Sequence, residues 1–515
     1  MKKSSLILGC LLASCLSSAA MAQDFSYKGS FTSDLRLTVP GQDMPGDVDK
    51  VRFDRSDNTF RFTGAFTYEQ VNVVADASIT YSGRSDVYEL QTLQKRSKVD
   101  PFYFESEALY LQIKDFIVDG FDLKIGRQIV EWGSADRFNP TSVINSLDLE
   151  DPQDFGRRVA NEMISLTFAP DWEIEGEDTP VFSDFQFQLV FVPTFRSSLV
   201  PYSSEYAFGG PEQFRRFAKS ETLNNLIDLQ ELFVKYHGTI LYNVKVEEPD
   251  DSIENSQVGI HMGFSLYGID FGFMAYYGFD HNVQPRDVNV HASATDKDVS
   301  AAIDAEIGNV FGTDQQRKNL MDLMDSFSYD GISTVTGDTD VTVIYPRVWV
   351  VGADFATSLD FIGGIGLWGE FTVTFHDDVP IYLNINGAKQ TDYQVKKGYF
   401  FKAVVGLDNS FTKWLYINTQ YIYGFVDEFG DNDIEHYWMI NADFKALNEQ
   451  MLIRLSVVMN ILDPSAIIMP SLSFKLWPGT EMILGALIHA GKDDSTFGNR
   501  TVGPNYVFFQ GKYSF

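Results

Sequence analysis

The stretch FRFTGAFTYEQVNVVADASITY, residues 60–81, alternates between apolar and polar residues with a period of two. Its first half places Phe60, Phe62, Phe66 and Tyr68 on one parity, and the residues between them are mostly polar. A period of two puts the two sets on opposite faces of a β-strand. The pattern resumes at Val71 after a tight connection, so the stretch predicts a β-hairpin.

The same alternation recurs along almost the whole chain. About nineteen stretches show it, and each has the length and pattern of a half-exposed strand. They are residues 25–37, 60–68, 71–81, 105–114, 121–132, 162–169, 184–192, 235–246, 257–267, 270–280, 340–356, 362–375, 398–407, 412–425, 436–444, 451–459, 467–476, 481–489 and 506–515.

A membrane-spanning strand needs only about 9 to 11 residues with every second one apolar, whereas a membrane helix needs about 20 apolar residues. After residue 22 no segment approaches that helical length. The apolar rows carry aromatics near their ends, as at Tyr421, Tyr423 and Phe425, and the mean hydropathy is near neutral at -0.12. The pattern therefore favours an all-β, transmembrane antiparallel barrel. A soluble β-sandwich, propeller or solenoid would also alternate and is the competing interpretation.

Bacterial single-chain barrels have even strand numbers, so either one of the nineteen stretches is in error or one strand is missed. Short and long connections alternate when counted forward from Gln23 and backward from Phe515, and the two counts collide between Pro170 and Gln257. We expect the error there. The prediction is about 18 strands, within 16 to 20.

The first 22 residues have the pattern of a secretory signal peptide. Lys2 and Lys3 precede an apolar run, and Ala20-Met21-Ala22 offers small residues for cleavage between Ala22 and Gln23. The competing interpretation is a lipoprotein box ending at Cys15. The predicted organisation is a signal peptide at 1–22 and an outer-membrane β-barrel at 23–515.

Composition narrows the function further. The two cysteines, Cys10 and Cys15, both lie in the leader, so the mature chain would have no disulfide and no cysteine nucleophile or ligand. The net charge of -31 argues against a nucleic-acid partner. The seven histidines are scattered, and HExxH, P-loop and G-x-S-x-G motifs are missing from the sequence. We therefore expect no enzymatic activity, no cofactor and no metal site, although the acidic turns 426–433 and 376–380 leave a calcium site as an alternative.

Three long inserts interrupt the strands, at residues 133–160, 194–234 and 282–339. The second has helical spacing at Leu223, Leu226 and Ile227. The third has apolar residues at helical spacing between 301 and 310, and Thr313 then provides a helix cap. Such inserts could fold into the lumen and narrow it or form an external lid.

The most distinctive run is LKIGRQIVEWGSADRFNPTSVINSLDLEDP, residues 123–152. Arg127 shares the parity of Leu123 and would face lipid, at a cost of about 2 to 4 kcal/mol at mid-bilayer. We therefore expect a bulge at Gly126 that turns Arg127 inward. Beyond it, Asp136, Arg137 and Asp148 are expected to pair within a loop that lines or constricts a pore.

This run resembles the G-R-Q and W-G segment of a porin-like family of Gram-negative outer-membrane proteins, distantly similar to alginate-export barrels. Ser146 stands where that family has a proline, which puts the exact turn of the loop in doubt. The matching positions are Gly126, Arg127, Gln128, Trp132, Gly133, Asn145 and Asp148.

The final segment, FFQGKYSF, resembles the terminal strand of Gram-negative outer-membrane barrels. In such barrels the last Phe, here Phe515, and the alternate aromatics, here Tyr513 and Phe509, are what the β-barrel assembly machinery recognises. We expect this strand to pair with residues 25–39, which would leave no free edge. The resemblance implies outer-membrane lipid, lipopolysaccharide and the assembly machinery as partners.

Together these patterns predict a passive porin-like channel or transport conduit in the Gram-negative outer membrane, for small or amphiphilic solutes. One alternative is an export barrel for polysaccharide, or a conduit that docks a periplasmic transport partner. Another is a closed structural or adhesion barrel. Arg127 and Asp136 are the predicted constriction, and the inward charges predicted to select solutes are Asp34, Arg36, Arg61, Arg127, Glu131, Asp136, Arg137 and Glu370.

Overall fold

The computed structural model describes residues 24–39, 51–85, 87, 90–176, 179–200, 218–235, 239–295, 297–328, 335–492, 495–498 and 505–515. The predicted signal cleavage at Ala22 and Gln23 lies outside these residues. The described residues form an 18-stranded antiparallel barrel and a separate five-stranded sheet. The predicted fold class and its strand number are confirmed.

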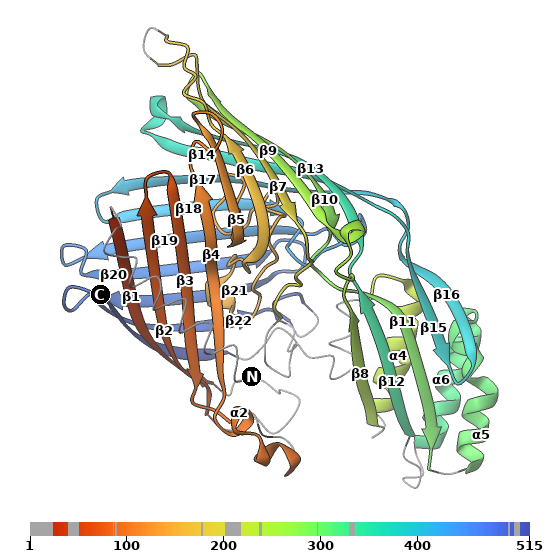
Figure 1. The fold of residues 1–515 in the computed structure, drawn as a ribbon. Coiled ribbons are helices and arrows are strands. Elements are labelled where there is room, and N and C mark those ends of the chain that lie inside the picture. The colour runs from red at the N-terminus through yellow and green to blue at the C-terminus, as the bar shows by residue number, and fades with distance from the viewer. Residues whose placement is uncertain are drawn as a thin grey trace.

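Figure 1 shows the barrel with the smaller sheet beside one of its ends. The barrel strands are β1 (Asp24–Thr38), β2 (Arg52–Tyr68), β3 (Val71–Ser82), β4 (Phe102–Ile113), β5 (Phe121–Gln128), β6 (Asn161–Phe168), β7 (Phe182–Val192), β9 (Gln257–Leu266), β10 (Ile269–Phe279), β13 (Arg347–Leu359), β14 (Ile365–His376), β17 (Gly398–Thr412), β18 (Leu415–Tyr423), β19 (His436–Ala446), β20 (Met451–Asn460), β21 (Ser465–Phe474), β22 (Thr480–Ala490) and β23 (Tyr506–Ser514).

The barrel closes between its first and last strands. β23 pairs antiparallel with β1 from Ser30↔Ser514 to Thr38↔Tyr506. Gly29 and Phe515 then exchange two backbone hydrogen bonds of 2.9 Å. The predicted pairing of the terminal strand with the first strand is confirmed, and every barrel strand has two neighbours.

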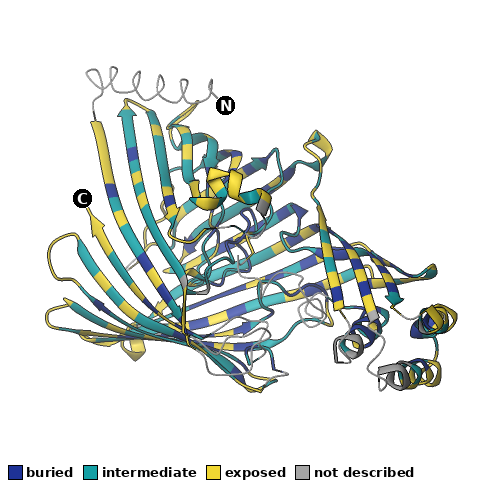
Figure 2. Ribbon diagram, turned by 90° about the horizontal axis from the view of Figure 1, so that it is seen from below, coloured by how far each residue is buried: buried dark blue, intermediate teal, exposed yellow. Residues whose placement is uncertain are grey.

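The alternation of the sequence becomes the two surfaces of the barrel wall, which Figure 2 shows as bands of exposed and buried residues along the strands. In β1, Phe31 is 46% exposed on the outside. Asp34 and Arg36, on the opposite parity, are only 8% and 4% exposed and face the interior. The apolar parity is thus the outer surface of the barrel.

The connections differ between the two ends of the barrel. The turn end carries most of the tight links, such as residues 69–70, 267–268 and 413–414. At the second of these, Tyr267 and Gly268 both have positive φ, as a two-residue type I′ hairpin turn requires. The loop end carries the long links 129–160, 193–256, 280–346 and 377–397, although its link 461–464 is also short.

Three of the long links build a second unit outside the loop end, which we call the loop-end unit. Its sheet has the order β16-β15-β11-β12-β8, with parallel pairs β8–β12 and β11–β15 that join different links. Its elements are β8 (Thr239–Glu247), β11 (Gln284–Ala294), β12 (Val335–Ile344), β15 (Val379–Ile385), β16 (Ala388–Val395), α4 (Glu221–Lys235), α5 (Lys297–Glu306), η5 (Ile307–Phe311) and α6 (Asp314–Ser328).

The helices of this unit cover one face of its sheet and bury a continuous apolar core. Leu223, Leu226 and Ile227 of α4 are at most 1% exposed, as their helical spacing predicts. Thr313 caps α6: its Oγ1 accepts from the Gln316 amide at 3.4 Å, and Gln316 Oε1 accepts from the Thr313 amide at 2.8 Å. The predicted cap is confirmed.

The loop-end unit explains why the sequence predicts about nineteen strands whereas the barrel has 18. Residues 235–246 belong largely to β8 of the small sheet, and they lie where the two counts collide. Residues 340–356 are the end of β12 and most of β13, rather than one strand. The predicted inserts 194–234 and 282–339 contribute helices and strands to this unit, whereas part of the insert 133–160 enters the barrel.

The remaining helices are short, namely η2 (Leu90–Gln94), α2 (Arg96–Val99), η3 (Pro152–Asp154), η4 (Ile253–Asn255) and η6 (Asp360–Ile362). Across the described residues, none of the helices is both long and apolar enough to cross a bilayer.

Replacing Leu226 by alanine tests the core of the loop-end unit. Removing a fully buried leucine side chain costs about 2 to 5 kcal/mol, so α4 should open locally without loss of the barrel. We expect limited proteolysis to cut residues 218–235 about tenfold faster or more, while the heat-modifiable migration of the barrel in gels stays the same. Leu241→Ala is the matched control, because Leu241 is 62% exposed on β8. Equal cleavage of the two variants would contradict the assigned core.

Candidate functional site

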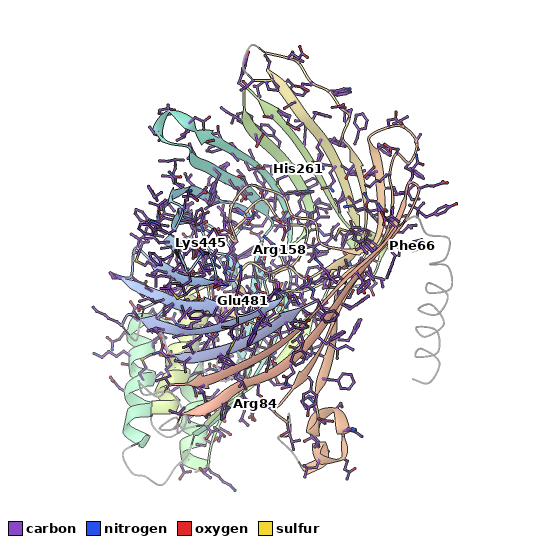
Figure 3. All side chains as sticks on the ribbon, turned by 90° about the vertical axis from the view of Figure 1, so that its left-hand side faces the viewer. Phe66, Arg84, Arg158, His261, Lys445 and Glu481 are labelled. Carbon is purple, nitrogen blue, oxygen red and sulfur yellow. The ribbon has the colours of Figure 1, made fainter. Side chains whose placement is uncertain are left out.

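The link between β5 and β6, residues 129–160, crosses the interior of the barrel, and we call it the lumen loop. Its side chains and backbone contact inward-facing groups of β1, β2, β4, β7, β13, β14, β18 and β23. Figure 3 labels Arg158 of this loop within the ring of strands. The lumen loop is therefore the candidate constriction of the barrel.

Two arginines of the wall hold one side of the lumen loop. Arg36 of β1 pairs with Asp34 at 2.7 Å and with Asp151 of the loop at 2.5 Å. Arg55 of β2 pairs with Glu150 at 2.8 Å and with Asp151 at 3.2 Å. Asp151 thus bridges the buried guanidinium of Arg36 and the half-buried guanidinium of Arg55, which come from neighbouring strands.

A second group of ion pairs, formed by Arg157, holds the lumen loop to the same side of the barrel farther along the chain. Arg157 pairs with Glu105 at 2.7 Å and Glu107 at 3.2 Å, both of β4, and with Asp148 of the loop at 3.1 Å. The pairing of β3 with β4 shifts so that Asp76 opposes Ala108 and Ala77 opposes Ser106, which leaves Glu107 unpaired in the ladder. Because of this bulge, Glu107 faces inward and contacts both Arg157 and Arg61.

Glu370 of β14 holds the opposite side of the lumen loop. It is 3% exposed and accepts hydrogen bonds from the amides of Ala135 (2.7 Å) and Thr141 (3.1 Å) and from Thr141 Oγ1 (2.7 Å). Gly133 has φ +91°, and a Cβ there would lie 2.2 Å from Glu370 Oε1. The Trp-Gly pair of the sequence motif thus lets the backbone approach this carboxylate.

Apolar contacts also attach the lumen loop to the wall on the side of Glu370. Phe138 of the loop stacks on Phe425 at 5.6 Å between ring centroids and joins a cluster with inward residues of β17 to β20. Trp132 donates from Nε1 to Gln188 of β7 at 2.7 Å and stacks on His261 of β9 at 5.4 Å. The loop is therefore charged on one side of the barrel and largely apolar on the other.

Asn145 organises the loop internally. Its Oδ1 accepts from the Val130 amide at 2.8 Å, and its Nδ2 donates to the carbonyls of Gln128 (3.2 Å) and Val159 (2.9 Å). The side chain is fully buried and ties the two ends of the loop together. This position is one of those that carry the family resemblance, and its role here is to close the loop.

The acidic residues of the loop have unequal titration behaviour. Burial favours the neutral form of Asp151, but hydrogen bonds and charge from Arg36, and the charge of Arg55, outweigh it and lower its pKa from 3.8 to about 2. Burial raises the pKa of both Asp148 and Glu150 above the ordinary values. Asp151 is thus the carboxylate whose charge the ion pairs stabilise most.

The predicted inward charges are found partly as expected. Asp34, Arg36, Arg61 and Glu370 all face the interior. Arg61 pairs with Asp76 at 2.7 Å and with Glu107. The structure brings Asp34 and Arg36 together, but Arg61 and Glu370 belong to opposite sides of the lumen loop.

Arg127 differs from the expectation. It opposes Leu109 and Glu162 in the sheet, and both belong to outward rows near the loop end. Its guanidinium pairs with Glu162 at 3.0 Å and donates to the Ser106 carbonyl at 2.6 Å. The bulge lies in β4 rather than at Gly126, so Arg127 remains on the outer row and the nearby carboxylate satisfies its charge.

The predicted pairing among Asp136, Arg137 and Asp148 is wrong. Asp148 pairs with Arg157, whereas Arg137 donates to the Gln153 carbonyl at 3.4 Å. The side chain of Asp136 is exposed, and its backbone carbonyl accepts from Phe138 and Gln420. Glu131 is exposed too, and it contributes to the electrostatic environment of Arg158.

Sequence reasoning missed most of the charged residues in and around the lumen loop, although a signal was present for them. Arg55 and Asp57 share the inward parity of Arg61, and Asp76 lies on the polar parity of the hairpin from which the fold was predicted. The others are clustered charges: Glu105, Glu107, Glu150, Asp151, Arg157 and Arg158.

The described residues contain no group of three or more His, Asp or Glu side chains arranged to hold a metal ion. In the acidic turn 426–433, Glu428 accepts from the amides of Phe425 and Glu435 and from the Tyr437 hydroxyl. This carboxylate therefore stabilises a turn.

Neither a family model nor a curated protein matches the chain. Solved structures resemble it at low identity. OccAB3 of Acinetobacter baumannii is 10% identical with a TM-score of 0.45, covering 96% of this chain and 99% of that one. OmpF of Salmonella typhi in complex with daunomycin is 9% identical with a TM-score of 0.36, covering 95% and 97%. Identities this low establish no family, so the resemblance to alginate-export barrels stays a prediction.

The ion pairs of Asp151 predict a pH dependence. Because the pKa of Asp151 is lowered from 3.8 to about 2, its carboxylate stabilises the folded loop fully above about pH 4, and this contribution is lost as the pH falls through about 2. In Asp151→Asn it is absent at every pH. We expect amides of residues 129–160 to exchange hydrogen faster in the variant than in the wild type at pH 6, with the difference shrinking toward pH 2.

Hydrogen exchange of the variant and of the wild type is measured by mass spectrometry at each pH. Because the two proteins are compared at the same pH, the intrinsic pH dependence of the exchange rate cancels. Asp340→Asn is the control, because Asp340 lies on β12 of the loop-end unit. A difference at pH 6 that stays constant down to pH 2 would contradict the assignment.

Proposed function

We propose that the protein is a passive channel of the Gram-negative outer membrane, in which the lumen loop forms the constriction and small amphiphilic solutes are the cargo. The observation that carries this proposal is a closed barrel with an apolar outer surface and a lumen loop attached to opposite sides of its interior. In the hydrocarbon core of a bilayer, only helices and closed barrels satisfy the hydrogen-bonding groups of their own backbone.

The difference between the connections supports an orientation. Outer-membrane barrels have short periplasmic turns and longer extracellular loops, so the turn end would face the periplasm and the loop-end unit the cell surface. Lipid and lipopolysaccharide would contact the outer rows. Phe509, Tyr513 and Phe515 lie 40%, 50% and 52% exposed on the outside, which is compatible with recognition by the assembly machinery.

The interior supports an amphiphilic cargo. On the side of β1 to β4 the wall presents alternating acidic and basic side chains that are mutually paired. On the side of β10 to β20 the wall beneath the lumen loop is apolar, with buried residues that include Tyr276, Val350, Phe400, Val404, Ile422 and Met439. A solute with a polar head and a small apolar body would find a matching surface on each side.

Recording single channels in planar bilayers tests this function. Glu150→Gln combined with Asp151→Asn removes the loop carboxylates that pair with Arg36 and Arg55 and should loosen one side of the lumen loop. We expect the mean conductance to rise at least about twofold, because the constriction becomes mobile. The matched control is Asp338→Asn with Asp340→Asn on β12, which should conduct like the wild type.

Absence of conductance in the wild type and in a variant whose lumen loop is replaced by a short glycine-serine linker would overturn the channel. In that case the second candidate, a closed adhesion barrel, gains support. The observation that favours it is the loop-end unit, a folded body that the wall alone does not require. Binding of cells or surfaces through that unit would then be the function.

A further inference from the structure

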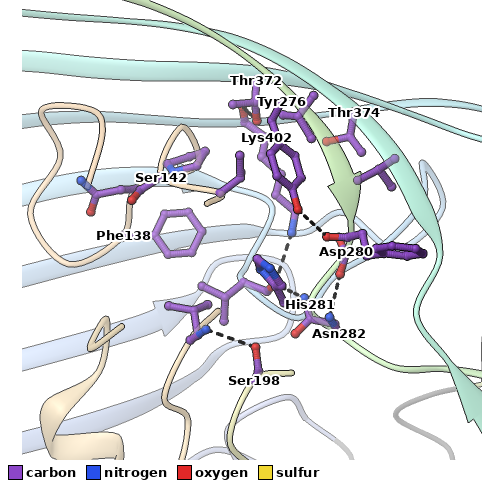
Figure 4. A pocket seen from close by; sticks show the side chains of 18 of the residues that line it. Phe138, Ser142, Ser198, Tyr276, Asp280, His281, Asn282, Thr372, Thr374 and Lys402 are labelled. Carbon is purple, nitrogen blue, oxygen red and sulfur yellow. Dashed lines mark hydrogen bonds between the residues drawn. The ribbon is translucent and has the colours of Figure 1, made fainter. Parts of the chain in front are cut away.

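A cavity of about 100 Å³ lies between the lumen loop and the inward face of β10, β13, β14 and β17. Figure 4 shows the side chains that surround it, with Asp280, His281 and Lys402 close to one another. Apolar lining comes from Phe138, Tyr276, Val348, Val350 and Phe400, and hydroxyl groups come from Ser142, Thr372 and Thr374.

Arg158 is the unusual group of this cavity. Its residue is 8% exposed, and its guanidinium donates to the backbone carbonyls of Asn145 (3.3 Å) and Asn139 (3.4 Å). In the described part of the chain, no carboxylate lies within ion-pairing distance of it. Its neighbour in sequence, Arg157, pairs with three carboxylates. Glu131 and Glu370 act on Arg158 through their charge but form no ion pair with it. A buried guanidinium without a paired carboxylate is energetically costly, which points to an anion that completes the site.

The other charges of the cavity do not remove this excess. Burial raises the pKa of Asp280, although the charge of Lys402 and a hydrogen bond of 2.9 Å from the Asn282 amide favour its carboxylate form. Burial lowers the pKa of His281 to about 3, so this imidazole is neutral at physiological pH. Burial also lowers the pKa of Arg158, to about 10, which still leaves it charged. Among the residues that line the cavity, the basic side chains Arg137, Arg158 and Lys402 therefore outnumber the acidic side chain of Asp280.

We propose that this cavity binds a small amphiphilic carboxylate, whose two oxygens pair with Arg158 and whose carbon skeleton packs against the apolar lining. Guanidinium groups match carboxylates in a planar, bidentate geometry. The volume fits a short chain, since a dry cavity of about 150 Å³ in another protein accepts benzene. This inference rests on the proposed function and names the chemical class of its cargo.

Titration calorimetry on the full chain in detergent tests the site with butyrate and with butyramide, its neutral isostere. We expect butyrate to bind at least tenfold more tightly than butyramide. Arg158→Gln should abolish this preference. Arg286→Gln is the matched control, because Arg286 pairs with Glu247 and Asp287 in the loop-end unit.

A second variant separates the site from the fold of the loop. Val350→Phe fills the cavity and leaves Arg158 and its carbonyl partners in place, so butyrate binding should fall at least tenfold. Heat-modifiable migration verifies that each variant is folded. Equal binding of butyrate and butyramide to the wild type, or unchanged butyrate binding in Arg158→Gln, would overturn the proposal.

Flux into liposomes distinguishes this site from the channel itself. Butyrate binding without any solute flux would refute the channel and leave the site standing. Solute flux without a butyrate preference in calorimetry would refute the site and leave the channel standing.

Discussion

Closure of the sheet between β1 and β23 is the constraint on which the rest of the structure depends. Once the last strand pairs with the first, the alternation of each strand must divide an outer from an inner surface. Charged side chains such as Arg36 are then confined to an interior with limited access to water. They need partners there, and the lumen loop and the neighbouring strands provide them.

On the charged side of the interior, the arrangement of the charges depends on the pairing register of β1 with β2 as well as on the composition of these strands. Arg36 opposes Arg55 and Asp34 opposes Asp57, so like charges face each other across β1 and β2. Direct cross-strand pairs of this kind are unfavourable. Asp151 of the lumen loop resolves the conflict by bridging both arginines, which makes the loop part of the electrostatics of the wall.

Sequence reasoning reached the barrel and its strand number because alternation is local and a one-residue slip reverses both faces. It missed β11, β15 and β16 because these strands are stabilised by pairing with other links, and the sequence of one link does not reveal that pairing. Arg127 shows a related limit. Its parity correctly indicates the outer row, but Glu162, which satisfies its charge, lies on the next strand. The partners of Arg157 were equally hidden, since a bulge in β4 sets the position of Glu107.

The parallel pairs of the loop-end unit have a consequence for the order of folding. β8 pairs with β12 and β11 pairs with β15, so the small sheet needs segments that leave the barrel after three different strands. The order of β7 to β17 in the wall brings these segments to one place, which lowers the entropic cost of joining segments so distant in sequence. We therefore expect the small sheet to form after this arc of the wall, because the wall holds its three contributing segments close together.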